Sequence, residues 1–141
     1  MSYDNACKYL AEKYPQAFVR WLLGIDSPRL QMLKTELIRE PIHADSLLWL
    51  QVDGRILHLE FQSLPPSRPP LPLRMLDYSI YLKRQYQCPV EQVIIFLKET
   101  DSPLAFVEAY RDETTYHGYR VIRMWEQTPE TFLNEPALLP L

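Results

Sequence analysis

Residues 46–62 read SLLWLQVDGRILHLEFQ, two β-rich runs on either side of the pair Asp53 and Gly54. Asp-Gly favours a two-residue type I′ turn, in which both turn residues take positive φ. The stretch therefore predicts a β-hairpin with one strand at 46–52 and the other at 55–62.

The tight turn also predicts the register of the hairpin. Leu47 should face Glu60, and Asp45 should face Gln62. Because side chains alternate along a strand, one face carries most of the polar residues of the pair and the other face is largely apolar. The first face holds Asp45, Leu47, Trp49, Gln51, Ile56, His58, Glu60 and Gln62. The second, which we expect to be the core side, holds Leu48, Leu50, Val52, Leu57, Leu59 and Phe61.

Before the hairpin, apolar residues recur at helical spacing from Asp4, a potential N-cap, to Gly24, where a helix would stop. This pattern predicts one amphipathic helix, and residues 30–39 slightly favour a strand. After the hairpin, the proline-rich residues 64–72 predict an extended loop. A stiff connector and a ligand for SH3-like domains are both compatible with that loop.

A second helix is predicted at 73–87, with an apolar stripe that includes Leu73, Leu76 and Ile80. The run at 91–98 is typical of a buried strand. Two further strands, at 106–113 and 118–125, should form a C-terminal β-hairpin through a polar turn, and Thr128 with Pro129 favours a short last helix. Helices and strands thus alternate, which indicates a mixed α/β fold.

The chain has 141 residues, 47% hydrophobic and 23% charged, which predicts one globular domain. We expect this domain at 1–126, followed by a tail at 127–141 whose apolar end suggests the start of a further region. A net charge of −3 argues against coating nucleic acid by bulk charge. Cys7 and Cys88 form no CxxC pair, and no signal peptide or membrane span is evident, so we expect a cytoplasmic protein.

The polar face of the hairpin suggests a metal site. Asp45 and Glu60 would be diagonal neighbours with backbones ~7 Å apart, close enough for one cation to bridge the two carboxylates. Hard oxygen ligands suit Mg²⁺ or Mn²⁺, and such an ion activates water for attack on a phosphodiester. Gln62 would orient that water or a phosphate oxygen, although it carries no positive charge.

Two other interpretations of this face stay open. The three polar residues of the metal hypothesis are equally compatible with the solvated side of an ordinary hairpin. A histidine site is weaker, because His43 and His58 would lie ~20 Å apart along the strands. Each histidine is better explained as a lone surface or core residue.

Basic residues of the second helix and the proline-rich loop offer contacts to a phosphate backbone. They are Arg68, Arg74, Lys83 and Arg84. A solvated helix face explains them as well.

Four blocks, HADSLLWL, HLEFQS, PLRMLDYSIYL and VIIFL, together resemble the Rpn family of recombination-promoting nucleases and putative transposases. The opening YDNACKYL is also similar to the start of that family, so the resemblance covers residues 3–97. Rpn proteins belong to the PD-(D/E)XK nuclease superfamily. The resemblance implies a restriction-endonuclease-like core of order α-β-β-β-α-β, with a mixed central sheet flanked by helices.

By position, the resemblance makes Asp45 and Glu60 the catalytic acids that bind Mg²⁺. Gln62 stands where most of the superfamily has lysine, so positive charge would come from the metal or from a basic residue such as Arg74 or Lys34. Asp4 matches an aspartate at the start of the family, in a supporting role, and Arg74 matches an arginine that opens the second helix.

The resulting hypothesis is a Mg²⁺-dependent DNA endonuclease connected with recombination or transposition. The alternative is a catalytically inactive nuclease-fold module that binds nucleic acid or a protein partner. A purely structural domain is a third reading. Rpn proteins run longer than this chain, so a truncated copy is also considered, and a homodimeric state is left open.

Overall fold

A computed structural model describes residues 3–33, 47–63, 70–133 and 135–138. Four α-helices occur in these ranges: α1 (Tyr3–Lys13), α2 (Pro15–Leu23), α3 (Leu71–Tyr86) and α4 (Glu130–Leu133). The strands are β1 (Gln31–Leu33), β2 (Leu47–Val52), β3 (Arg55–Gln62), β4 (Val90–Phe96), β5 (Ala109–Arg111), β6 (Tyr116–Gly118) and β7 (Arg120–Arg123). Short 3₁₀ turns lie at η2 (Pro103–Phe106), η3 (Met124–Glu126) and η4 (Pro136–Leu138).

The main sheet has five described strands in the order β1-β2-β3-β4-β7. Strands β1, β2 and β3 are antiparallel neighbours, whereas β4 runs parallel to both β3 and β7. The parallel step from β3 to β4 needs a crossover, which α3 supplies. The predicted mixed α/β class is therefore confirmed.

The hairpin forms as its sequence predicts. Leu47 faces Glu60 and Val52 faces Arg55. Asp53 and Gly54 have φ of 47° and 83°, as a type I′ turn requires. The hydroxyl of Ser27 donates to Asp53 Oδ1 at 3.0 Å, which fastens the turn to the segment after α2.

The N-terminal helix is two helices, so the prediction of a single one is wrong. Pro15 begins α2 and has no N–H to continue the hydrogen bonding of α1. Gly24 does end α2 as predicted, with φ of 71° and its N–H donating to the Arg20 carbonyl.

The apolar stripe predicted for the second helix is also wrong. Leu73 and Ile80 are 45% and 47% exposed. The buried stripe of α3 includes Met75, Tyr78 and Leu82, which recur at the same helical spacing. Both stripes recur at helical spacing. Packing of α3 against the sheet buries the stripe that contains Arg74.

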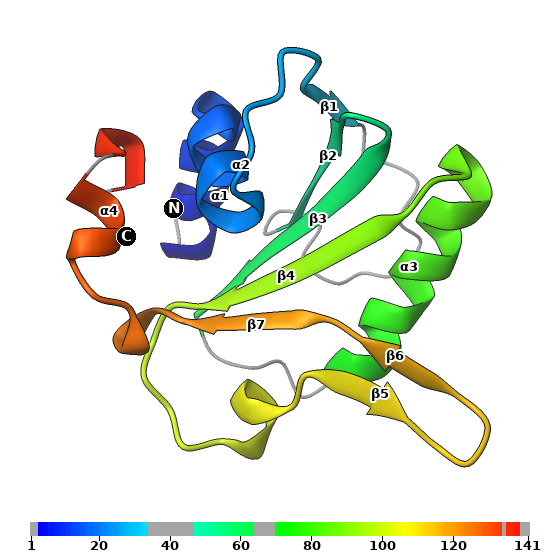
Figure 1. Cartoon of the computed structure of the whole chain (residues 1–141). Coiled ribbons are helices and arrows are strands. Elements are labelled where there is room, and N and C mark those ends of the chain that lie inside the picture. Colours follow the sequence, from blue (N-terminus) through cyan, green and yellow to red (C-terminus); the bar gives the residue numbers. More distant parts are fainter. Residues whose placement is uncertain (1–2, 34–46, 64–69, 134, 139–141) are drawn as a thin grey trace.

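The predicted C-terminal hairpin is correct only in its first half. β5 pairs with β6 in a small second sheet, with Tyr110 facing His117. After Tyr119 the chain continues as β7, which joins the main sheet beside β4 (Figure 1). His117, expected in the turn, therefore lies on a strand.

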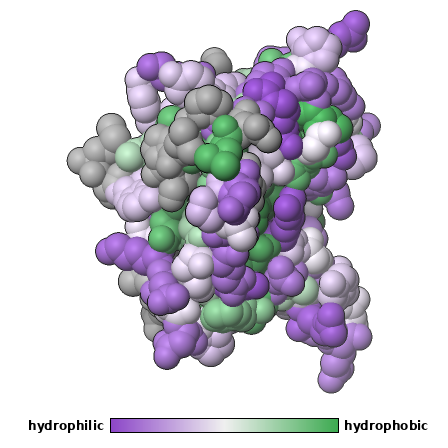
Figure 2. Space-filling model, turned by 60° about the vertical axis from the view of Figure 1, so that its left-hand side comes forward, coloured by the Kyte–Doolittle hydropathy of each residue, from purple (hydrophilic) through white to green (hydrophobic). Residues whose placement is uncertain are grey.

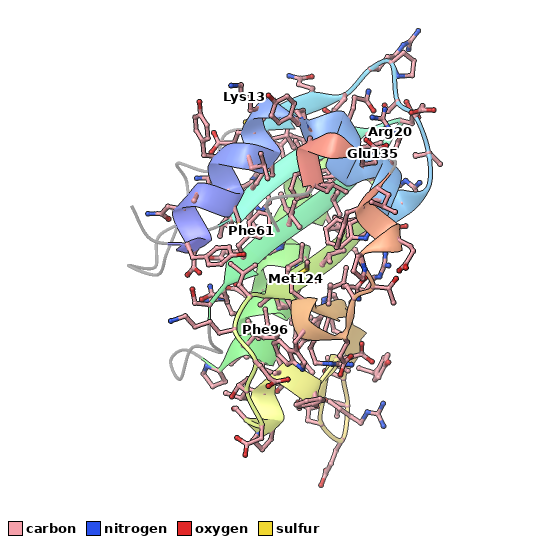
Figure 3. All side chains as sticks on the ribbon, turned by 90° about the vertical axis from the view of Figure 1, so that its left-hand side faces the viewer. Lys13, Arg20, Phe61, Phe96, Met124 and Glu135 are labelled. Atoms are coloured by element: carbon pink, nitrogen blue, oxygen red, sulfur yellow. The ribbon has the colours of Figure 1, made fainter. Side chains whose placement is uncertain are left out.

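The helices lie on both sides of the main sheet (Figure 1), with α1, α2 and α4 on one side and α3 on the other. On the first side, Leu50, Leu59 and Phe61 pack with Phe18 of α2 in an apolar core. Phe61 is seen below α1 in Figure 3. On the other side, Trp49 packs with Tyr78 of α3. Both faces of the hairpin are consequently buried.

The C-terminal segment contributes to the first core through buried Phe132 and Leu138, although it was expected to be a tail. Arg20 and Glu135 form an ion pair on this side (Figure 3). Arg20 Nε donates to Glu135 Oε1, and Arg20 Nη2 donates to Glu135 Oε2 at 3.0 Å. The face of the molecule seen in Figure 2 carries both hydrophilic and hydrophobic residues, and hydrophobic ones are found near the centre of this view.

Candidate functional site

Glu60 is the centre of the polar face of the hairpin. It lies near the end of β3, pairs with Leu47 of β2 on one side and lies beside Ile94 of β4 on the other. Its side chain is 1% exposed. His58 and Gln62, two residues before and after it, are also buried, so the interpretation of Glu60 and Gln62 as part of a solvated hairpin face is wrong.

Three side chains surround the Glu60 carboxylate. Arg74 Nη2 of α3 donates to Oε2 in a buried ion pair, and Gln62 Nε2 donates to the same oxygen at 3.3 Å. On the other side, His58 Nε2 lies 3.4 Å from Oε1, longer than an ordinary N–H···O hydrogen bond. Oε2 is thus well satisfied by the described residues, while Oε1 has no close hydrogen-bond donor among them.

Electrostatics keep Glu60 ionised despite its burial. Burial is the largest single influence and raises its pKa, because removal from water disfavours the charged form. The polar contact with His58, the charge of Arg74 and the hydrogen bond from Gln62 together outweigh burial, so the pKa of Glu60 is lowered. The site therefore holds a carboxylate at neutral pH.

A buried ion pair requires an explanation, because desolvation offsets much of the attraction between its partners. The β3 alternation places Glu60 on the α3 side, and helical spacing places Arg74 one turn before Tyr78 on the buried stripe. Each charge is therefore buried by the element opposite, and each neutralises the other. Arg74, predicted to contact DNA, is 3% exposed and is occupied by this pair.

A hydrogen-bonded chain extends the site into β4 and β6. Gln92 Nε2 lies 2.9 Å from His58 Nδ1 and 2.8 Å from the Met75 carbonyl, and His117 Nε2 lies 2.5 Å from Gln92 Oε1. Sequence analysis missed Gln92 and the part played by His117. The available signal was a polar residue within a buried strand, since β4 is otherwise apolar from Val93 to Phe96.

Several predicted site residues lie outside the described residues: Asp45, Lys34, His43 and Arg68. Asp4 is described, and its carboxylate accepts a hydrogen bond from Ser63 Oγ at the end of β3. Ser63 has the strand parity of Phe61, which packs under the N-terminal helices. Asp4 thus lies at the same end of β3 as Glu60 but on the opposite side of the sheet.

Lys83 and Arg84, the other predicted DNA contacts, are exposed in the last turn of α3. Nine residues separate Lys83 from Arg74, which corresponds to about 14 Å along a helix. The two residues therefore lie well away from Glu60, and their contact with DNA stays a prediction.

The fit of a divalent metal can be judged from Glu60. An ionised carboxylate whose Oε1 has no close donor is a suitable oxygen ligand for Mg²⁺. No group of three His, Cys, Asp or Glu side chains that could hold an ion occurs in the described ranges. The described residues thus offer a metal only one carboxylate, and the second predicted ligand, Asp45, lies outside them.

A groove of about 520 Å³ opens beside the start of β4, lined in part by Glu108, Tyr116 and Tyr119. Gln92 belongs both to this lining and to the chain that ends at Glu60. Burial raises the pKa of Tyr119 to about 12, with a further contribution from the charge of Glu108, so its phenol is neutral at neutral pH.

Comparison with known proteins identifies no relative: no protein-family model, no curated protein and no solved structure matches the chain. In the part of the chain that the structure describes, none of the helices has the length and apolar character to cross a membrane. Cys7 and Cys88 are free thiols, and burial, followed by the charge of Asp4, raises the pKa of Cys7 to about 12.

Proposed function

We propose that this protein is a metal-dependent endonuclease that hydrolyses DNA phosphodiesters at the site around Glu60. The observation that carries the proposal is a buried carboxylate that stays ionised on the polar face of a central strand, with Gln62 two residues further on. The order α1-α2-β1-β2-β3-α3-β4 supports a restriction-endonuclease-like core, as does the resemblance to Rpn nucleases.

In this proposal Asp45 and Glu60 hold Mg²⁺ or Mn²⁺. The ion would polarise the phosphodiester and lower the pKa of a bound water. Arg74 keeps the Glu60 carboxylate in one orientation and compensates its charge, while Gln62 holds the same oxygen by a hydrogen bond. Oε1 would then be the oxygen that faces the ion. A role in recombination or transposition follows from the resemblance alone.

A second candidate is a catalytically inactive module that binds nucleic acid or a protein. The observation that favours it is the neutralisation of Glu60 by Arg74, because a carboxylate that already has a cation has less need of a metal. The two candidates share a fold and differ in metal dependence.

The experiment is cleavage of supercoiled and linear DNA with Mg²⁺, with Mn²⁺ and with chelator, alongside calorimetric titration of Mn²⁺. We compare wild type with Asp45→Asn and Glu60→Gln, each first checked for cooperative unfolding. Asp77→Asn is the matched control, since Asp77 is an exposed carboxylate of α3.

The nuclease proposal expects cleavage and Mn²⁺ binding that are lost in both variants and retained in Asp77→Asn. If the folded wild type neither binds Mn²⁺ nor cuts DNA, the proposal is overturned and the inactive module takes its place. If Glu60→Gln proves unfolded, Asp45→Asn alone decides the question.

A further inference from the structure

The side chain of Gln92 can be oriented without ambiguity from its surroundings. A carbonyl oxygen only accepts hydrogen bonds, so the atom 2.8 Å from the Met75 carbonyl must be the amide nitrogen. The same nitrogen lies 2.9 Å from His58 Nδ1, and its second hydrogen points there. The amide oxygen is left to accept from His117 Nε2 at 2.5 Å.

The orientation of Gln92 decides the tautomer of His58. Because Nδ1 accepts a hydrogen bond from Gln92, it cannot carry a proton. A neutral His58 then carries its proton on Nε2, the atom that lies 3.4 Å from Glu60 Oε1. The donor side of the ring is thus turned toward the carboxylate.

The four side chains then form a chain in which every donor points toward the anion. His117 donates to Gln92, Gln92 donates to His58, and His58 faces Glu60 with its N–H. The two hydrogen bonds from His117 to Gln92 and from Gln92 to His58 are aligned and polarise each other, which strengthens the positive character of the Nε2–H that faces Glu60. His58, Glu60 and Gln92 are each less than 5% exposed, so water does not compete.

We propose that Gln92 is a positioning residue: by fixing His58 as the Nε2–H tautomer, it directs a hydrogen-bond donor at Glu60 and holds that carboxylate in one orientation. The proposal concerns residues of β4 and β6 that the sequence motifs do not include. It rests on the proposed function in one respect only, namely that the Glu60 carboxylate is there to bind a metal.

The test is a long-range ¹H–¹⁵N correlation spectrum of the imidazole rings, recorded on the full chain without metal or DNA. The chain has three histidines, and His43→Gln and His117→Gln assign the signals. In wild type we expect His58 with a proton on Nε2 and none on Nδ1. A wild-type His58 protonated on Nδ1 overturns the proposal.

Gln92→Glu is the decisive variant. A carboxylate at this position accepts hydrogen bonds and does not donate, so it should draw a proton onto Nδ1 of His58. Glu91→Gln is the control, because Glu91 is an exposed neighbour on the same strand and pairs with Arg55. An unchanged His58 spectrum in folded Gln92→Glu overturns the proposal, as does a change of equal size in Glu91→Gln.

Mn²⁺ titration separates this proposal from the proposed function. If wild type binds Mn²⁺, loss of the positioning residue in Gln92→Met should weaken the affinity about 10-fold or more, as is usual for residues that orient metal ligands. An unchanged Mn²⁺ affinity in Gln92→Met overturns the proposal that Gln92 positions the Glu60 carboxylate. If wild type binds no Mn²⁺ while the tautomer is as expected, the nuclease proposal fails and the role of Gln92 toward Glu60 stands.

Discussion

The two faces of the β2–β3 hairpin are both buried, but they are buried by different kinds of side chain. The face under α1 and α2 is apolar beyond Arg55 at the start of β3, and it packs with residues such as Phe18 and Val19. The face under α3 buries Glu60, His58 and Gln62, together with an arginine from the helix. The first face needs only matching shape, whereas the second must also compensate buried charges and polar groups.

This difference teaches where specificity is located in the molecule. Apolar residues tolerate exchange for others of similar volume, so the α1 and α2 side constrains its sequence loosely. A buried carboxylate without its cation is much more costly than a cavity of one methyl group. We therefore expect the α3 side to be the more sensitive of the two, and the predictions below test that expectation.

The largest effect should follow Arg74→Met, which leaves Glu60 buried without its cation. We expect the free energy of unfolding to fall by about 3–5 kcal/mol, measured by urea denaturation at neutral pH. The double variant Glu60→Gln with Arg74→Met should recover much of the loss, because neither partner then has an uncompensated charge. A double variant no more stable than Arg74→Met would contradict the ion pair as the cause.

Leu59→Ala tests the apolar face, where Leu59 is fully buried beside Phe61. The cavity should lower the free energy of unfolding by about 2–5 kcal/mol. Leu59→Met, which nearly conserves volume, should cost less than about 1.5 kcal/mol. Equal losses in both variants would show that this face is as demanding as the other.

Gly54→Ala isolates the turn that joins the two strands. Gly54 has φ of 83°, and a Cβ there would meet nothing within 4 Å, so any cost is conformational. We expect a loss of about 1–2 kcal/mol in thermal or urea unfolding. A neutral result would mean that the positive φ of Gly54 does not matter to the hairpin.

The smallest expected effect is a difference in how strongly the stability of two proteins depends on pH. The pKa of Glu60 is lower in the folded state than its ordinary value of 4.5, so its stabilising contribution is present above that value and is lost as pH falls through the folded pKa. Between neutral pH and acid, wild type should therefore lose more stability than the double variant Glu60→Gln with Arg74→Met. Parallel pH profiles for the two proteins would contradict an ionised Glu60.

Prediction from sequence succeeded where the information was local. The Asp53-Gly54 turn determines which residues of β2 and β3 face each other, because two positive φ values leave one geometry. The helix α3 was predicted correctly but its buried stripe was not, because two stripes satisfied the helical period. Prediction was also wrong for the second half of the C-terminal hairpin, because pairing with β4 competed with pairing to β5.

For the candidate site, alternation along β3 predicted correctly that Glu60 and Gln62 share a face. It did not indicate that the face would be buried, because burial depends on α3, which begins nine residues after Gln62. The contact of Gln92 with His58 could not be predicted from the sequence for the same reason. The parallel register of Gln92 beside His58 exists only after the crossover through α3 has been made.

By itself, therefore, the sequence determined the mixed α/β class, the hairpin and its register, and the common face of His58, Glu60 and Gln62. These follow from dihedral preferences and a period of two, which act between near neighbours. The tertiary structure alone decided that Arg74 neutralises Glu60 and that Gln92 orients His58. Such contacts join segments distant in sequence, and their energy depends on the removal of water that only packing accomplishes.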